Sequence, residues 1–393
     1  MKPQWRAWHG WMLGFMLLIV LPTFIQRPDR TDLHLLVQAA HRLMAGEAVY
    51  RLQDVNEHTK PPLVTFLFLG PSQIPLFWLS RLWDLLNVLA CVFLLRVLVR
   101  KVEPLSGVLR FSLALMAAFL CLTPLNAELR LGQYNILFLA WLTAAGFYRR
   151  DILAGVGLCL AVLFKPPFIF LMPWILRGAN RPLRVLGAGA GALAIICAAY
   201  ALSFGAHRLV ADCSEWARFL PQSSAKHLLR PDNHGLPSAL AALWGGNPEK
   251  IFLLVGIAWA TAFAFFVPDR VLALALGCVA MVVFTPMAWM QNYSLLLPAG
   301  VWAFDRLAKS RGIARGVLAA SVGVLWIGIG ALNPTTCAWT ACEQWTFQRV
   351  PLWALLAALG LAVLSQYIGC FWRGDGGRAP GSPTPKGIPQ REQ

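Results

Sequence analysis

Residues 151–177 read DILAGVGLCLAVLFKPPFIFLMPWILR, two apolar runs separated by one lysine and two prolines. Each run is short for a membrane, because a helix needs about 20 residues to cross a hydrocarbon layer of about 30 Å. A lysine at membrane depth costs about 2.5–3.5 kcal/mol on insertion scales and usually marks a functional site or reaches an interface. The stretch therefore predicts tilted or partly re-entrant segments around a functional Lys165, with a lysine that only snorkels as the alternative.

The rest of the chain has the composition of a polytopic membrane protein. Of its 393 residues, 58% are hydrophobic and 13% are charged, whereas a soluble protein has about 25% charged residues. We predict an all-α polytopic membrane protein with its transmembrane domain over residues 1–372 and a disordered, Gly- and Pro-rich cytoplasmic tail over residues 373–393. About twelve transmembrane helices are expected, at residues 8–25, 74–98, 107–124, 134–149, 151–164, 166–177, 185–205, 250–267, 270–286, 292–305, 313–331 and 350–371.

Basic residues set the expected orientation. The short loops on one side and the two termini hold most of the 34 lysines and arginines. By the positive-inside rule, the chain is a multi-pass protein of the cell (inner) membrane with both termini inside and the long loops 26–60 and 206–249 outside. This distribution also accounts for the net charge of +16 without any nucleic-acid partner.

Polar clusters from separate parts of the chain fall on the predicted outer face. Residues 31–45 have apolar residues at helical spacing, which predicts an amphipathic helix lying on the membrane. Asp32 at its start suits either a helix cap or a general base. Gln133 and Asn135 begin a span and could bind substrate or join helices, and His234 could be an acid–base group or simply solvated. With Lys165 at headgroup level, such a face suits a lipid-linked anion.

Two further observations concern cofactors and cysteines. No cluster of His, Cys or carboxylates has metal-ligand spacing, so we expect neither a metal nor another cofactor. Cys337 and Cys342 are near enough in sequence to form a small disulfide loop in an oxidising compartment. Two free thiols are the alternative.

The order of these clusters resembles glycosyltransferase family 87, polytopic enzymes of the GT-C fold class. The family pattern has an Asp in the first outer loop, then Tyr-Pro-Pro-Leu, Gly-Gln-x-Asn, a Lys before prolines, Asn-Gln-Ser-Leu and Ser-Pro-x-x-Trp-x-His-His. The matching segments here are residues 32–50, 60–63, 132–135, 165–167, 233–236 and 285–292. Lys60 replaces the family's tyrosine, and Gln291 and Asn292 replace its two histidines, so the acceptor or the sugar can differ.

The resemblance implies an inverting transfer of a hexose or pentose, commonly mannose, from a polyprenyl-phosphate sugar to a hydroxyl of a glycan or glycolipid acceptor. The transfer would take place at the outer face of the membrane, in contact with membrane lipid. Asp32 would be the general base, and Lys165 with Arg130 would hold the donor phosphate. The residues implied in substrate binding are Gln133, Asn135, Asn233, His234, Gln291 and Asn292. A transporter or flippase of a lipid-linked sugar is the alternative, and a non-catalytic membrane subunit that kept the fold is a third.

Overall fold

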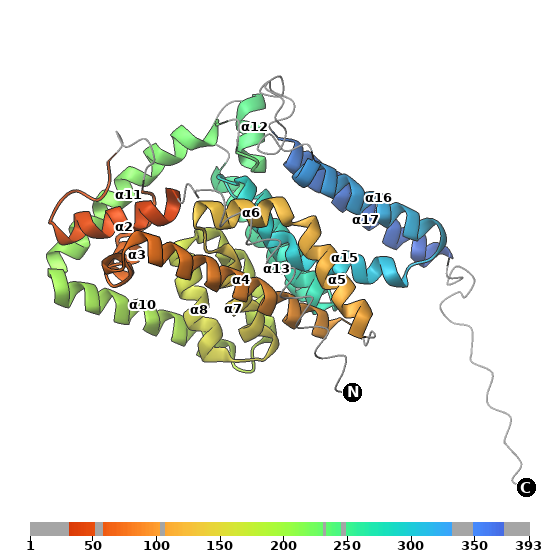
Figure 1. Ribbon diagram of the computed structural model, residues 1–393, viewed down its shortest axis with the longest axis horizontal. Coiled ribbons are helices and arrows are strands. Elements are labelled where there is room, and N and C mark those ends of the chain that lie inside the picture. Colours follow the sequence, from red (N-terminus) through yellow and green to blue (C-terminus); the bar gives the residue numbers. More distant parts are fainter. Residues whose placement is uncertain are drawn as a thin grey trace, which may run out of the picture.

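The computed structural model describes residues 31–51, 58–102, 107–230, 233–244, 249–331 and 349–372 (Figure 1). Every regular element within these ranges is helical. The predicted span 8–25, the possible pair Cys337 and Cys342, and the tail 373–393 lie outside the described residues. The elements are α2 (Thr31–Met44), α3 (Pro62–Leu67), η1 (Pro71–Gln73), α4 (Leu76–Lys101), α5 (Gly107–Leu120), α6 (Leu122–Leu131), α7 (Asn135–Phe147), α8 (Asp151–Phe164), η2 (Pro166–Leu171), α9 (Met172–Gly178), α10 (Pro182–Phe204), α11 (Ala206–Leu228), α12 (Leu236–Trp244), α13 (Glu249–Phe266), α14 (Arg270–Val283), η3 (Met290–Leu296), α15 (Leu297–Lys309), α16 (Gly312–Trp326), η4 (Ile327–Ala331) and α17 (Val350–Trp372).

The apolar helices make this a membrane protein, but the predicted number of spans is not confirmed. In the described part, three helices are long and apolar enough to cross a membrane: α4, α10 and the stretch Gly312–Ile329. A fourth span is possible if α5 and α6 count as one, although the two helices are bent by 65°. The shorter apolar helical stretches, of 10–17 residues, are Asn135–Phe147, Asp151–Phe164, Lys250–Phe266, Arg270–Val283 and Val350–Ser365. At about 1.5 Å per residue, α7 and α8 are each roughly 20 Å long.

The lysine–proline stretch breaks the chain where the sequence predicted a disturbance. α8 ends at Phe164, and Lys165 is extended, with φ −150° and ψ 95°. Prolines lack the backbone N–H that would continue a helix, and they disfavour helical geometry in the residue before them. The expected span 166–177 is therefore a 3-10 segment, η2, followed by the seven-residue helix α9. Both pack against α13 and α14.

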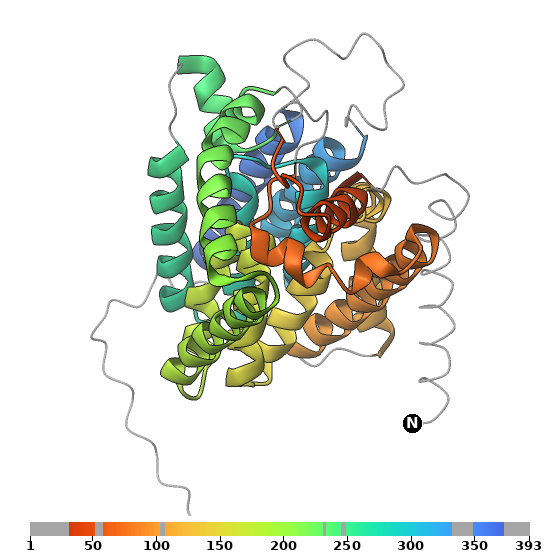
Figure 2. The same ribbon diagram turned by 90° about the vertical axis from the view of Figure 1, so that its left-hand side faces the viewer.

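The amphipathic helix exists, but its apolar face lies inside the protein. Leu33, Leu36 and Ala40 are at most 1% exposed, and α2 packs against α3, η1, α4 and α6. Figure 2 shows α2, in red, between the green helices α10 and α11 and the orange α4. The period of its apolar residues predicts a helix with one buried face, but it cannot distinguish a membrane surface from a protein surface as the covering layer.

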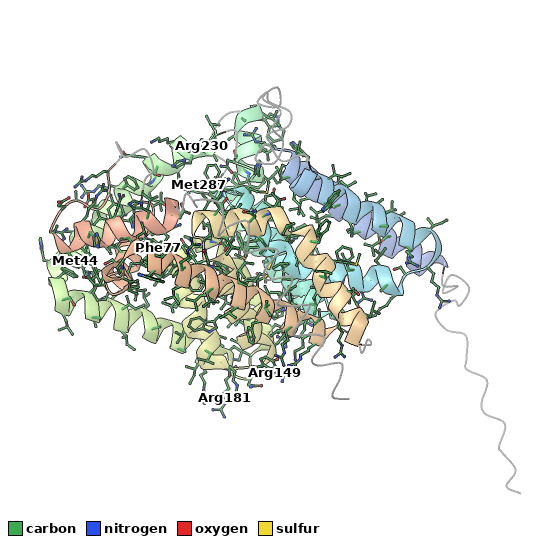
Figure 3. All side chains as sticks on the ribbon, viewed as in Figure 1. Met44, Phe77, Arg149, Arg181, Arg230 and Met287 are labelled. Atoms are coloured by element: carbon green, nitrogen blue, oxygen red, sulfur yellow. The ribbon has the colours of Figure 1, made fainter. Side chains whose placement is uncertain are left out.

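The predicted outer loop 206–249 is largely helical, because it contains α11 and α12. A small apolar cluster joins α11 to α2, α3 and α10 and includes Leu43, Tyr50, Tyr200 and Phe219. A much larger apolar cluster extends through α4–α8, α14 and α15. Arg149 and Arg181, expected in inner loops, lie at the opposite edge of the molecule from Arg230 and Met287, expected outside (Figure 3).

Candidate active site

Asp32 is the second residue of α2 and lies near the junction of α6 and α7. The side-chain amide of Gln133 donates a hydrogen bond to Asp32 Oδ2. The close approach of α2 depends on Gly132, which ends α6 with φ +70°; a Cβ at this position would lie 2.8 Å from Leu33 Cβ. Glycine adopts this left-handed conformation without steric penalty and leaves room for the neighbouring helix. Gly132 therefore brings Asp32 and Gln133 together.

The backbone of Gln133 is held by α4. Its carbonyl accepts hydrogen bonds from Trp83 Nε1 at 2.8 Å and from Asn87 Nδ2 at 3.1 Å. Asn87 is 2% exposed, so its amide requires such a partner. With its backbone anchored, Gln133 presents its side chain to the carboxylate from a fixed position.

Lys60 reaches the same place from the segment before α3. Its carbonyl accepts a 2.9 Å hydrogen bond from Tyr50 Oη, which fixes the backbone. Its Nζ lies 5.6 Å from the centroid of the Tyr134 ring, and the two side chains are hydrogen-bonded. Tyr134 Oη in turn donates to the carbonyl of Phe164 at 3.1 Å. Lys60 is therefore connected through Tyr134 to the end of α8, one residue before Lys165.

Lys165 enters the cluster from the break between α8 and η2. Its Nζ donates to Asn292 Oδ1 at 2.6 Å, and Asn292 Nδ2 donates to the Met287 carbonyl at 3.2 Å. Because Lys165 is extended, its side chain leaves the helix axis and meets η3, which is 127 residues later in the chain. The proline break thus accounts for the position of the cation.

Glu128 holds the floor of the cluster together. This carboxylate is 1% exposed and accepts three hydrogen bonds: from Asn135 Nδ2 at 2.8 Å, Ser294 Oγ at 2.7 Å and the Ile136 backbone N–H at 3.1 Å. It therefore joins α6, the first turn of α7 and η3. Electrostatically, Glu128 and Lys165 act on each other as a carboxylate and an ammonium group.

The cluster contains two carboxylates and two lysines, Asp32 and Glu128 with Lys60 and Lys165. Burial raises the pKa of Asp32, and the positive charges of Lys60 and Lys165 offset only part of this effect. Burial alone would lower the pKa of Lys60, yet Tyr134 and Asp32 raise it overall, so Lys60 stays charged. A basic carboxylate beside two cations can accept a proton and hold an anion at the same time.

A second polar group lies around Asn233, in the connection between α11 and α12. Asn233 Oδ1 accepts from the backbone N–H groups of Gly235 at 3.1 Å and Ala288 at 3.0 Å, and Nδ2 donates to the Pro286 carbonyl at 2.7 Å. The His234 ring is 4% exposed and contacts the Tyr293 ring edge-on, 6.2 Å between centroids. Asn233 therefore joins this connection to the segment between α14 and η3.

The structure brings together five of the predicted site residues and places the others differently. Those brought together are Asp32, Gln133, Asn135, Lys165 and Asn292. Gln291 is 7% exposed, and its carbonyl accepts from Ser294 Oγ at 2.7 Å. Arg130 is exposed on α6. Among the described residues, no group of three or more His, Cys, Asp or Glu side chains is arranged to hold a metal ion.

The sequence analysis assigned no role to two members of the cluster, Lys60 and Glu128. Lys60 was noted only as a departure from the family pattern. Glu128 is the only acidic residue between Glu103 and Asp151, and a carboxylate in so apolar a stretch needs partners or a function. That isolation was the available signal for Glu128. The sequence feature that could have indicated Lys60 is a positively charged residue directly before two prolines.

Comparison with known proteins identifies the family. The model of glycosyltransferase family 87 matches residues 58–288, more than half of the chain. This range includes Lys60, Glu128 and Lys165, whereas Asp32 precedes it and Asn292 follows it. Searches of curated proteins and of solved structures found no significant match. The chain therefore belongs to glycosyltransferase family 87 and is a glycosyltransferase.

Proposed function

We propose that the enzyme transfers a hexose or pentose, most simply mannose, from a polyprenyl-phosphate sugar to a hydroxyl of a glycan or glycolipid, with Asp32 as the general base. The observation that carries the proposal is the meeting of a basic carboxylate with two cations. The pKa of Asp32 is raised by burial, and Lys60 and Lys165 both act on it. A base and a phosphate-binding group are the two functions that this transfer requires.

The reaction is a single displacement. The Asp32 carboxylate takes the proton of the acceptor hydroxyl while the acceptor oxygen attacks the anomeric carbon from the face opposite the phosphate. The bond between the anomeric carbon and the phosphate oxygen breaks, and its electron pair stays on the phosphate. Polyprenyl phosphate leaves with one more negative charge than the phosphate had in the donor, and the configuration at the anomeric carbon is inverted. Lys165 stabilises that charge.

Apolar surface beside the cluster supports a lipid-linked donor. Trp83, which holds the Gln133 backbone, lies in the first half of α4. Phe77 and Trp78, one to two turns earlier, are 60% and 64% exposed. Large exposed apolar side chains on an apolar helix suit contact with lipid chains. A polyprenyl chain could follow α4 while its phosphate stays at the lysines. We assign this end of the molecule to the outer face of the cell membrane, with both termini inside.

The Asp32→Asn variant tests the proposal. Asparagine keeps the shape of the side chain and can still pair with Gln133, but it cannot take the proton at neutral pH. We expect the rate of sugar transfer from radiolabelled polyprenyl-phosphate mannose to fall by about 10²–10⁴-fold, with unchanged elution and melting temperature in detergent. Glu47→Gln is the matched control, because Glu47 is exposed and forms a surface ion pair with Arg51, and it should transfer normally.

Two results would refute this mechanism. Full activity of the Asp32→Asn variant would remove the base. A product that retains the anomeric configuration would exclude the single displacement, whatever the variant does. Transport of the intact donor without any covalent transfer, over a panel of glycan and glycolipid acceptors, would count against the proposed donor and acceptor.

A further inference from the structure

Lys60 is a cation that was not among the residues predicted to bind the donor phosphate. That site paired Lys165 with Arg130, but Arg130 is exposed on α6. Lys60 instead is hydrogen-bonded to Tyr134 and acts electrostatically on both Asp32 and Lys165. This second cation next to the base therefore needs its own account.

We infer that Lys60 is a second ligand of the donor phosphate, and that it is shared between Asp32 before transfer and the leaving phosphate after it. This inference rests on the proposed function, because it uses the same donor and the same base. Lys60 would touch the substrate directly. Its one positive charge would interact with the general base before transfer and with the leaving phosphate after it.

The charge balance of the step supports this role. Before transfer, Asp32 is a carboxylate and the donor phosphate is a diester with one negative charge. Afterwards, Asp32 is neutral and the phosphate is a monoester with two negative charges. One unit of negative charge has thus moved from Asp32 to the phosphate, and the total is unchanged. A cation next to both Asp32 and the phosphate interacts favourably with the Asp32 carboxylate before transfer and with the phosphate after it. The cation therefore need not be desolvated again during the reaction.

The geometry around Lys60 suits such a shared cation. An ammonium group has three donors, and one of them is used by Tyr134. The Tyr134 hydroxyl is itself oriented, because it donates to the Phe164 carbonyl at 3.1 Å. The backbone of Lys60 is held by Tyr50 at 2.9 Å. The backbone of Lys60 is therefore fixed, and its ammonium group has one oriented neighbour, Tyr134. The other two N–H donors of the ammonium group can bind an anion beside Asp32.

A pH profile can report the interaction of Lys60 with Asp32. Asp32 interacts with Lys60, Lys165 and Tyr134. The other ionisable groups on its own helix and on the helices packed against it are His34, His41 and Arg42 on α2, Arg81, Asp84, Cys91, Arg96, Arg100 and Lys101 on α4, and Glu128 and Arg130 on α6. His58, close to Lys60 in the chain, does not interfere, because burial, together with Lys60 and Arg42, lowers its pKa to about 3. Removal of Lys60 should raise the pKa of Asp32, and so move the acid limb of kcat/KM to higher pH.

The test compares Lys60→Met with Lys60→Arg, and uses Lys250→Met as a matched control, since Lys250 is exposed at the start of α13. For Lys60→Met we expect the KM for polyprenyl-phosphate mannose to rise about tenfold or more. We expect the acid limb to move up by about one pH unit. Lys60→Arg should restore most of both properties, and Lys250→Met should match the unmodified enzyme.

A measurement on the unmodified enzyme covers the case in which Lys60→Met fails to fold. Lysines are labelled by reductive methylation with and without polyprenyl phosphate, and the labelled sites are read by mass spectrometry. Polyprenyl phosphate should protect Lys60 and leave Lys250 unchanged. Inorganic phosphate at the same concentration should protect less, because it lacks the lipid chain.

The results separate this inference from the proposed function. The inference is wrong if Lys60→Met keeps the donor KM and the acid limb of the Lys250→Met control, or if polyprenyl phosphate leaves the labelling of Lys60 unchanged. In that event, loss of transfer in Asp32→Asn would still support the proposed function. Full transfer by Asp32→Asn would instead overturn the proposed function, and with it the assignment of Lys60.

Discussion

The two carboxylates of the cluster, Asp32 and Glu128, are held in opposite ways. Glu128 accepts three hydrogen bonds from two side chains and one backbone N–H. Asp32 accepts one from Gln133, and its charge interacts with those of Lys60 and Lys165. A carboxylate whose oxygens are occupied by several donors stabilises the fold, whereas one with few hydrogen bonds beside two cations is suited to accept a proton from a substrate. The difference assigns structure to one carboxylate and chemistry to the other.

The largest expected effect on stability belongs to Glu128→Ala. This change leaves the Ile136 N–H without its acceptor and leaves Asn135 Nδ2 with only a 3.5 Å contact to the Gln291 carbonyl, which also remains as the acceptor for Ser294 Oγ. It also removes a charge that offsets Lys165. We expect a loss of about 3 kcal/mol in the free energy of unfolding, measured by thermal or denaturant unfolding in detergent. Asp32→Asn should lose less than about 1 kcal/mol, since the asparagine oxygen can still accept the hydrogen bond from Gln133.

The comparison fails if these two variants are equally stable, or if Asp32→Asn is the less stable one. Glu128→Gln is the useful intermediate variant, because it keeps one acceptor oxygen for Ser294 but turns an N–H group toward another donor. Its loss of stability should fall between those of the other two. A Glu128→Gln enzyme that folds normally but transfers nothing would give Glu128 a chemical role instead.

A smaller expected effect concerns the contact between Gly132 and Leu33, which positions Asp32. Gly132→Ala introduces a Cβ at 2.8 Å from Leu33 Cβ, in a backbone with φ +70°. The helix α2 must move away, and Asp32 moves with it. Because a displacement of about 1 Å can reduce rate up to about 10²-fold, we expect kcat to fall by about tenfold or more, with the donor KM less affected. Gly46→Ala is the matched control, since Gly46 also has a positive φ, +74°, but has open space around it.

A pH profile distinguishes the two carboxylates by function. Transfer requires ionised Asp32, and its pKa lies above the ordinary value for aspartate because burial outweighs the nearby lysines. Activity should therefore fall as the pH drops through this raised pKa, at a higher pH than for an ordinary aspartate. In the Asp32→Glu variant, the acid limb of the pH profile of any residual activity should be shifted. If the acid limb is unchanged in this variant, the titration belongs to another group.

The sequence predicts the helical segments well and the way they end less well. Apolar runs locate α4, α7, α8, α10 and α13 closely because burial in lipid or protein requires continuous apolar residues. The 65° break between α5 and α6 was not predicted, although Pro124 in the first turn of α6 marks it, since proline lacks the N–H that would continue the hydrogen bonding of α5. In the site, Asp32 and Lys165 stood out as charges in conspicuous places. Lys60 did not, since it is 28 residues from Asp32 and 105 from Lys165 in the chain, and only packing brings the three together.

The smallest expected effect separates the exposed Arg130 from the partly buried lysines of the cluster. Arg130 was predicted to hold the donor phosphate with Lys165, but it is exposed on α6, two residues beyond the buried Glu128. A helix turns about 200° over two residues, so a side chain at 130 points away from the face that carries Glu128. Arg130→Ala should therefore change the donor KM by less than about twofold, whereas Lys165→Met should raise it by about tenfold or more. A large rise in Arg130→Ala would mean that the phosphate lies on the solvent-exposed side of α6, and that Asp32, Glu128, Lys60 and Lys165 serve the fold alone.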